Sequence, residues 1–377
     1  MLTAISMPPG NGDSSRARRY HRAHRWLSVA GFILDLAYLI VLLLTGWSLR
    51  LRSFALSRAA QPALALLIYL FLFGLFHEAL DLPISYLKGY RLEHRYGLSN
   101  LTMRSWAKDR LKGWAVGGAL AILGFELIYW TMRQWPRQWW EICATAFIAF
   151  FILLANLAPL ILLPLFFKFK PVEDPELTKR LMELSQRAGK RVRGVYEWKL
   201  SEKSKKANAA LTGLGNTRRI IISDTLLDHF SPTEVEAVLA HEFGHHVRHH
   251  VLRGLAIEIL TTFIGFYAVN AALKSWGPTF GFHGLADFAN LPLLLLVVGG
   301  LSFLLLPLVN LHSRQMEREA DSYALASIAS PAAFISSMEK LAEMNLSERR
   351  PAAWIEFLFH SHPSIEKRIA FAKNWSR

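Results

Sequence analysis

Cysteine and charge are what this 377-residue sequence has least of. Its one cysteine, Cys143, falls inside an apolar stretch, so the chain can form neither an internal disulfide nor a thiolate metal cluster. Charged residues make up 19% of the chain and hydrophobic residues 52%, which is too apolar for an ordinary soluble protein of this length. The sequence therefore predicts a membrane protein.

Apolar stretches long enough to cross a bilayer, at roughly 20 residues per crossing, occur six times. They cover residues 27–46, 62–80, 114–132, 142–168, 254–273 and 289–309. The first follows a basic tail, residues 1–26, as in a secretory signal peptide, but no small-x-small cleavage site closes it, so we interpret it as a retained span. The expected fold class is a mainly α, multi-pass membrane protein with six to seven transmembrane helices.

Basic residues outnumber acidic ones, for a formal net charge of +14, and their distribution follows the predicted spans. Five arginines precede the first span and seven lysines and arginines lie in the 81–113 loop, whereas the loops on the other side hold three, two and one. This positive-inside pattern predicts cytoplasmic termini in a protein that contacts membrane lipid. No recognition motif accompanies a basic face, so nucleic acid is not an expected partner.

Two polar regions, residues 169–253 and 310–377, flank the last two spans, which occupy 254–309, while the first four spans make up 27–168. Counting the crossings puts both polar regions on one side of the membrane. Within the first, residues 175–190 have helical apolar spacing, and the β-rich stretches GVYEWKL and RRIIISDTLL bracket NAALTGLGNT, which holds turn residues such as Asn216. A small sheet or hairpin beside helices is expected.

A helix start follows the predicted sheet. Ser231 and Glu234 form a capping box, and Pro232 occupies the first helical position between them. The helix that begins there carries the sequence His-Glu-Phe-Gly-His at residues 241–245, an H-E-x-x-H motif. Its two histidines project from one face, where neutral imidazoles can reach one Zn²⁺ at about 2.0–2.1 Å.

The glutamate of the motif, Glu242, lies near the same face and can deprotonate a metal-bound water, whose pKa zinc lowers toward about 7. The competing interpretation is a basic interfacial helix with no metal. Three further histidines fit that interpretation better than ligation and are not assigned to the site: His246, His249 and His250.

A catalytic zinc usually takes three protein ligands and leaves one position open. The extended pattern H-E-x-x-H-x-x-G-x-x-H is not met, so the third ligand must come from elsewhere. Residues 313–325 hold Glu317 and Asp321 on one predicted helical face, while Glu319 points away. One of the two can bind zinc while the other orients a ligand histidine, although such carboxylates are also typical of a solvated helix face.

The succession of H-E-x-x-H and, two spans later, E-x-x-x-D resembles the integral-membrane zinc metalloproteases of the CAAX prenyl protease family. Four other stretches resemble family segments in the same order: LEHRYGLSNLT (92–102), LLPLFFKFKPVEDPEL (162–177), NAALTGLGNTRRIIISDTLL (208–227) and SHPSIEKRIA (361–370). Leu98 and Ser99 depart from the family's usual Phe and Asn. The short link after Asp228 is typical of a prokaryotic member.

The resemblance implies a gluzincin-like zinc protease domain with one Zn²⁺ per chain. His241, His245 and Glu317 would be its ligands, Glu242 the general base and Asp321 the residue that orients a ligand histidine.

Further roles implied by the family concern the substrate. His362 and Arg368 would line the site and help hold the carbonyl oxygen as it becomes an oxyanion. Asn208 and Ala209 fall where the family holds substrate by backbone pairing with an edge strand. Without the family, His362 would be an ordinary turn residue, and Asn208 is explained equally well as part of a hairpin turn.

The expected function is a membrane-embedded zinc metalloendopeptidase that cuts near the C-terminus of a peptide or protein, which can carry an isoprenoid or other lipid. The alternatives are a quality-control membrane protease of the same superfamily and a non-catalytic zinc-containing scaffold, against which Glu242 argues. The site is expected toward the cytoplasmic side of a bacterial inner membrane, or of the ER membrane in a eukaryote. Hydrolysis there needs a hydrated cavity, and three glutamates are candidates to line it: Glu78, Glu126 and Glu258.

Overall fold

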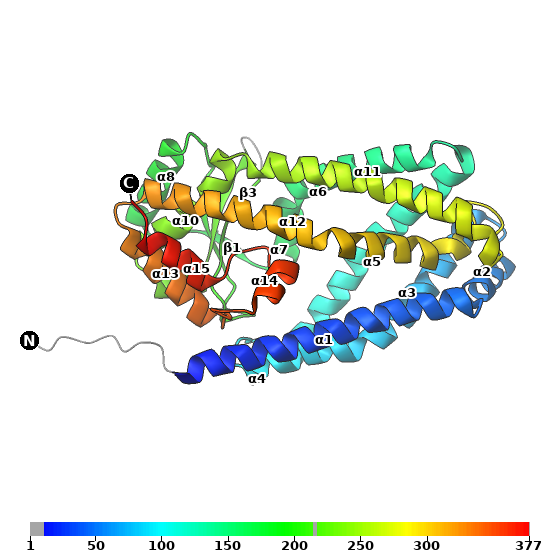
Figure 1. The fold of residues 1–377 in the computed structure, drawn as a ribbon, viewed down its shortest axis with the longest axis horizontal. Helices are drawn as coiled ribbons and strands as arrows, with labels where there is room; N and C mark the ends of the chain where they lie inside the picture. Colours follow the sequence, from blue (N-terminus) through cyan, green and yellow to red (C-terminus); the bar gives the residue numbers. More distant parts are fainter. Residues whose placement is uncertain (1–10, 214–216, 377) are drawn as a thin grey trace, which may run out of the picture.

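The computed structural model describes residues 11–213 and 217–376, and within them six helices are long and apolar enough to cross a membrane. The main helices of these spans are α1 (Asn11–Leu44), α3 (Pro62–Tyr86), α5 (Met103–Gln134), α6 (Trp139–Leu157), α11 (His250–Trp276) and α12 (Leu291–Ser327). The molecule is elongated: α1 and α3 run along one side, α11 and α12 along the other, and α5 crosses between them (Figure 1). The expected number of spans and the mainly helical class are confirmed.

Most of these helices extend well beyond the apolar stretches that predict them. After α3 the chain continues through the π-helical segment η1 (Leu87–Leu92) and α4 (Glu93–Arg95), so most of the predicted 81–113 loop is helical. Helix α12 passes through the boundary expected at 309/310, and α11 begins before the one expected at 253/254. Hydropathy detects only the apolar part of a helix, and polar turns that continue it leave no such signal.

The end of the molecule opposite the sheet is closed by packed aromatic side chains, and we call it the far end. Here α2 (Trp47–Arg58), η4 (Gly277–Phe280) and η5 (Phe288–Asn290) connect the long helices. Tyr129 and Trp139 are fully buried there. The Tyr129 hydroxyl donates to Asn290 Oδ1 at 2.7 Å, and Trp139 Nε1 donates to Asn270 Oδ1 at 3.0 Å.

A small sheet occupies the other end, reached from α6 through η2 (Ala158–Leu162) and α7 (Leu163–Phe166). Its described strands are β1 (Phe169–Pro171), β2 (Val195–Trp198), β3 (Ala209–Thr212) and β4 (Arg219–Ser223), in the order β1-β2-β4-β3. Among these strands only β2 and β4 pair in parallel, and β3 lies at an edge of the sheet. The predicted sheet is confirmed.

Of the expected turn residues, Gly215 and Asn216 lie outside the described part of the chain, while Gly213 directly follows β3 with a positive φ of 84°. In RRIIISDTLL, however, the strand ends at Ser223, and the residues after it form α9 (Asp224–His229). The physical reason is a cap: Ser223 Oγ accepts a hydrogen bond from the Leu226 amide and starts the helix.

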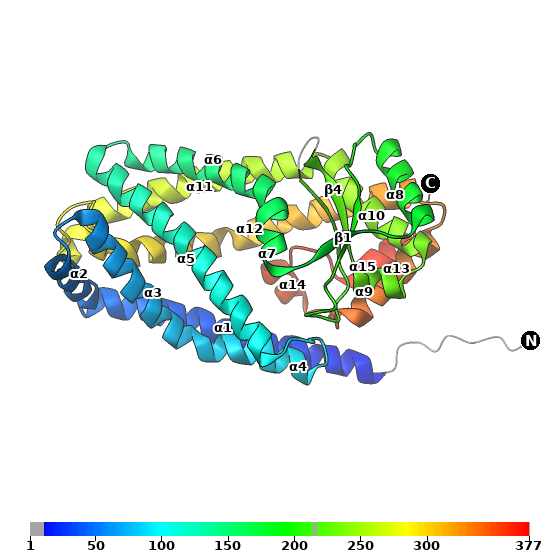
Figure 2. The ribbon, with the colours of Figure 1, turned by 180° about the vertical axis from the view of Figure 1, so that it is seen from behind.

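Helices pack against this sheet around a common apolar core. They are α8 (Pro175–Arg187), α10 (Pro232–Val247), α13 (Pro331–Met344) and α15 (Ile365–Lys373), whereas α14 (Ala353–Phe359) packs against α12 (Figure 2). The predicted capping box of α10 is present: Ser231 Oγ accepts from the Glu234 amide, and Glu234 Oε2 accepts from the Ser231 amide at 2.7 Å. The core side chain Phe243 is fully buried beneath the sheet and sets which face of α10 turns outward.

Candidate active site

The site forms where α10 and α12 approach each other closely. A Cβ atom on Gly244 would lie 2.9 Å from Ala320 Cα and 3.0 Å from its carbonyl oxygen. Only glycine permits this approach, because both of the obstructing atoms belong to backbone. Glu317 lies three residues before Ala320 on α12, so the crossing brings its carboxylate over the two histidines of α10.

Three ligand-type side chains converge at this crossing. His241 Nε2 lies 3.3 Å from Glu317 Oε2, His245 Nε2 lies 3.4 Å from Glu317 Oε1, and the two Nε2 atoms are 3.2 Å apart. Ligands about 2.0–2.1 Å from one tetrahedral ion are themselves separated by about 3.3 Å. Glu317 Oε2 is also buried without a hydrogen-bond donor among the described residues. The three side chains therefore fit a zinc ion.

Asp321 and Arg368 hold the Nδ1 side of the His241 ring, opposite the nitrogen that faces Glu317. Asp321 Oδ1 lies 2.8 Å from His241 Nδ1, and the buried Arg368 donates to both Asp321 oxygens, at 2.6 and 2.9 Å. Burial and the nearby Arg368 lower the pKa of His241, but the adjacent carboxylates of Asp321 and Glu317 outweigh both and raise it to about 9. The site thus favours positive charge, as a cation-binding site does.

A second set of residues, which sequence reasoning left off the site, supports His245. Its Nδ1 lies 3.0 Å from Nδ1 of His250, whose Nε2 lies 3.0 Å from Glu319 Oε2. Arg253 donates to both oxygens of Glu319, at 2.6 and 3.3 Å. As expected, Glu319 points away from Glu317, but its carboxylate contacts His250 and Arg253 instead of being surrounded only by solvent.

Glu242 and His362 lie in a cleft of about 520 Å³ beside this crossing, together with His241 and Arg368. Glu242 is half-buried and makes no hydrogen bond or ion pair to the described residues. His362 Nε2 lies 3.2 Å from Glu317 Oε1, and its side chain is 60% exposed. The chain thus brings together Glu242 and His362, which lie more than a hundred positions apart, and of the two the Glu242 carboxylate is the one without a partner among the described residues.

Asn208 and Ala209 also line the cleft, but their backbones face different ways. The Asn208 carbonyl accepts from the Ser223 amide at 2.9 Å, and its own amide donates to Ser223 Oγ, so its backbone pairs with β4. Backbone groups alternate along an antiparallel strand, so those of Ala209 point outward from the sheet. Of the two, only Ala209 can pair with a substrate strand, and Asn208 is not in a hairpin turn.

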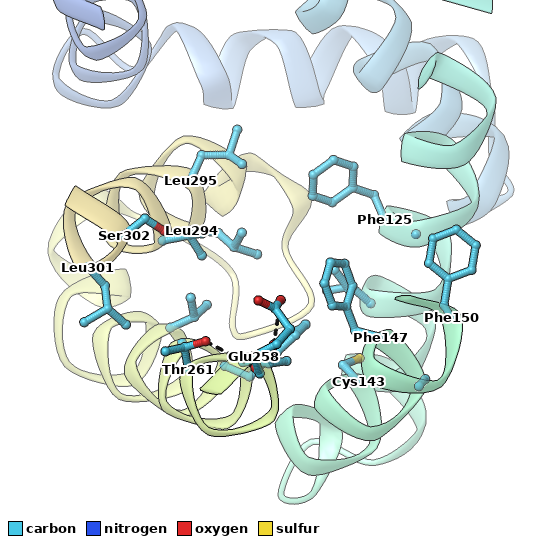
Figure 3. Close-up of a pocket in the computed structure, with 18 of the residues that line it drawn as sticks. Phe125, Cys143, Phe147, Phe150, Glu258, Thr261, Leu294, Leu295, Leu301 and Ser302 are labelled. Atoms are coloured by element: carbon cyan, nitrogen blue, oxygen red, sulfur yellow. Dashed lines mark hydrogen bonds between the residues drawn. The ribbon is translucent and has the colours of Figure 1, made fainter. Parts of the chain in front are cut away.

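Only one of the three glutamates expected in a hydrated cavity lines the large apolar pocket among the long helices. That pocket of about 730 Å³ is lined by α5, α6, α11 and α12. Glu258 points into it between Phe147 and Leu294 (Figure 3). Glu78 instead forms an ion pair with Arg110 at 2.6 Å and, like Glu126, is absent from the described lining.

The family models that match this chain divide it into the region of the first four spans and the region that begins at the sheet. Residues 11–168 match the family model described as CAAX prenyl protease N-terminal, five membrane helices, and residues 171–376 match Peptidase family M48.

Individual relatives match over nearly the whole length. An uncharacterized metalloprotease, YhfN, of Bacillus subtilis (strain 168) is 31% identical, over 95% of this chain and 84% of the relative. CAAX prenyl protease 1 of Saccharomyces cerevisiae is 29% identical, over 98% of this chain and 88% of the relative. The crystal structure of S. mikatae Ste24p matches with a TM-score of 0.85 and 26% identity, covering 99% of this chain and 93% of that one. The chain therefore belongs to peptidase family M48, as a multi-pass membrane metalloendopeptidase similar to the CAAX prenyl proteases.

Proposed function

We propose that this protein is a zinc endopeptidase that cleaves near the C-terminus of lipid-modified proteins, with His241, His245 and Glu317 holding one Zn²⁺ per chain. The observation that carries the proposal is the convergence of these three ligand atoms beside the unpaired Glu242. When bound, zinc would polarise the scissile carbonyl and make an attacking water acidic enough to ionise near neutral pH. The family itself implies a metal cofactor and a peptide or protein substrate.

The side chains around the ion then have separate tasks. A carboxylate oxygen of Glu242 takes a proton from the attacking water and later passes it to the leaving amine, because no neighbouring group of the described chain occupies it. The exposed His362 donates to the carbonyl oxygen as negative charge develops there. Arg368 is better placed to hold Asp321 and, through it, His241, since its described hydrogen bonds to carboxylates all go to Asp321.

The edge strand supports cleavage near a C-terminus. A substrate that pairs antiparallel with β3 uses Ala209 and runs onward to Ala207. There the Asn345 side chain already pairs with the backbone, accepting from the Ala207 amide at 2.9 Å and donating to its carbonyl at 3.1 Å. This occupied position closes the substrate edge on the C-terminal side of the cleft. An ion pair between Arg25 of α1 and Glu348 lies behind it.

The apolar pocket supports a lipid on the substrate. Two helices, α11 and α12, line the pocket and also contribute to the site, and Val309 of the pocket precedes Glu317 by eight residues. At about 1.5 Å per residue, the end of the pocket nearest the site lies about 12 Å from Glu317, measured along the axis of α12. A hydrocarbon chain in the pocket and a peptide in the cleft can therefore belong to one substrate molecule.

The runner-up function is a quality-control protease that degrades damaged membrane proteins with the same zinc site. Such an enzyme has to accept long unfolded chains, whereas the edge strand here is blocked at Ala207. For the location we propose a bacterial inner membrane with the site toward the cytoplasm, because the basic residues that predict the cytoplasmic side flank the end of the spans nearest the site.

Purified full-length protein in detergent or nanodiscs tests the proposal. Zinc content should be about one per chain, and Glu242→Gln should lower kcat by about 10²–10⁴-fold with zinc retained. The matched control is Glu202→Gln, at an exposed glutamate paired with Lys168, which should cleave like the wild type. Equal cleavage by Glu242→Gln and wild type would overturn the mechanism.

The substrate is tested separately with peptides read by mass spectrometry. A farnesylated peptide, the same peptide without the lipid, and an unfolded membrane protein should be cleaved in that order of kcat/KM, with the cut a few residues from the C-terminus. Fastest cleavage of the unfolded membrane protein, at many positions, would favour the quality-control function instead.

A further inference from the structure

We propose that His250 is a positioning residue for the metal site: it holds His245 in the ring orientation and tautomer that ligation needs, and Glu319 and Arg253 hold His250 in turn. The inference rests on the proposed zinc site, because it concerns how one of the proposed ligands is prepared. It is carried by a continuous line of contacts from His245 to Arg253, each of 3.0 Å or less.

The hydrogens along this line can be placed one by one. To offer Nε2 to a metal, neutral His245 must carry its hydrogen on Nδ1, which then donates to the nitrogen 3.0 Å away, Nδ1 of His250. His250 Nδ1 must therefore be unprotonated, so its hydrogen is on Nε2 and donates to Glu319. Arg253 keeps Glu319 as an ionised acceptor. The position of the hydrogen on each ring therefore determines which nitrogen of the next ring carries one.

A break between two helices makes the contact possible. On a continuous helix a residue five positions beyond His245 would lie about 140° round the axis, away from its ring. Instead α10 ends at Val247, and His249 adopts a left-handed conformation with φ 56° before α11 begins. The chain thereby turns His250 back onto His245, with the two rings edge to face at 5.0 Å between centroids.

The two histidine ligands are thus supported in parallel but unlike ways. His241 donates to a carboxylate, Asp321, whereas His245 donates to a second, neutral imidazole. Side-chain burial makes an unpaired N–H costly on either ring. If His250 is removed, the hydrogen of His245 either stays unpaired on Nδ1 or moves to Nε2, where it blocks ligation.

Three substitutions at one position separate the two contacts of His250. In His250→Asn the amide oxygen replaces Nδ1 and can accept from His245, but Glu319 is not reached. In His250→Gln the amide nitrogen replaces Nε2 and can donate to Glu319, but the acceptor for His245 is lost. His250→Leu removes both. Zinc affinity, measured by chelator competition on full-length protein, should fall about 10–100-fold in the Gln and Leu variants and by much less in Asn.

A spectroscopic readout and controls accompany these measurements. The visible absorption of Co²⁺ bound in place of zinc should change in the Gln and Leu variants and stay close to wild type in Asn. Glu319→Ala, which leaves His250 in place, should weaken zinc binding less than His250→Leu, and Glu202→Ala should leave it unchanged. Melting of the metal-free proteins checks that each variant folds.

Equal zinc affinity in the Asn and Gln variants, or wild-type affinity in His250→Leu, would overturn the inference. Should the metal-free Leu variant unfold, the Asn and Gln comparison, made with near-isosteric side chains, still decides. Failure of the wild type to bind zinc, by contrast, would overturn the proposed function.

Discussion

The two ends of the long helices are packed tightly, while the middle between them stays open. At the site end, α10 and α12 meet without space for a Cβ at Gly244. At the far end, Tyr129, Trp139 and their amide partners are buried. Between these ends, the four helices around Glu258 leave a pocket of about 730 Å³.

This difference separates the two regions that stabilise the fold, which are the packed ends, from the region with room for a ligand, which is the middle. The buried Tyr129 hydroxyl and Trp139 ring nitrogen at the far end have hydrogen-bond acceptors, and so does the buried Arg368 at the site end, as the low-dielectric interior favours. The middle lacks such packing, and open apolar volume contributes nothing to folding because its lining atoms lose their contacts. We infer that the ends hold the helices apart so that the middle can receive a substrate, and substitutions in the three parts should therefore have different effects.

The largest effect is expected at the site end from Gly244→Ala. The new methyl group meets the backbone of α12, so the helices must separate and carry Glu317 away from the histidines. We expect most zinc binding and cleavage to be lost. Zinc content and kcat/KM measure this, with Gly118→Ala on α5, where a Cβ meets nothing within 4 Å, as the control. Full activity of Gly244→Ala would contradict the close approach.

At the far end, Asn290→Leu should reduce stability rather than catalysis. It leaves the Tyr129 hydroxyl without its acceptor and the Leu285 carbonyl without its donor. The expected cost is about 2–4 kcal/mol, seen as a lower melting temperature. Below that temperature kcat and zinc content should match the wild type. A large loss of kcat at unchanged melting temperature would show that the two ends are not independent.

In the middle, Gly265→Phe should act on the lipid alone. Gly265 lines the pocket and has open space at its Cβ position, so a benzyl group fills volume without a clash in the packed ends. We expect kcat/KM to fall about tenfold, or about 1.4 kcal/mol, for a farnesylated peptide and little for the unmodified one. Gly299→Phe, on an exposed face of α12 outside the described pocket lining, is the matched control. Equal losses on both peptides would remove the pocket from substrate binding.

The smallest effect concerns acid stability at the site end. Burial alone would raise the pKa of Glu234, but hydrogen bonds from Lys340, Ser336 and Ser231 outweigh it and hold the pKa below its ordinary value of 4.5. A lowered folded pKa stabilises the protein above the unfolded pKa, and this stabilisation is lost as the pH falls through the folded value. Glu234→Gln should cost about 1 kcal/mol at pH 7. Its melting temperature should approach that of the wild type below about pH 4.5, and a constant gap would contradict the prediction.

Local sequence was sufficient for the helices and for half of the site. Hydropathy found the six spans, and the four-residue spacing of His241 and His245 put both rings on one face of a capped helix. The edges of the spans were not found, because polar turns extend α3 and α12 beyond the apolar windows. The roles expected for His362 and Arg368 came from family resemblance, since nothing near them in the chain marks them as part of a site.

Sequence by itself thus determined a membrane protein with an H-E-x-x-H helix, because periodicity and composition act over a few neighbouring residues. Only the tertiary structure decided that Gly244 allows the crossing, that the backbone groups of Ala209 rather than those of Asn208 point away from the sheet, and that His250 contacts His245. These depend on how helices cross and where a left-handed residue turns the chain. The residues that make these contacts are far apart in sequence or are separated by a break between two helices. No local sequence pattern therefore predicts that they touch.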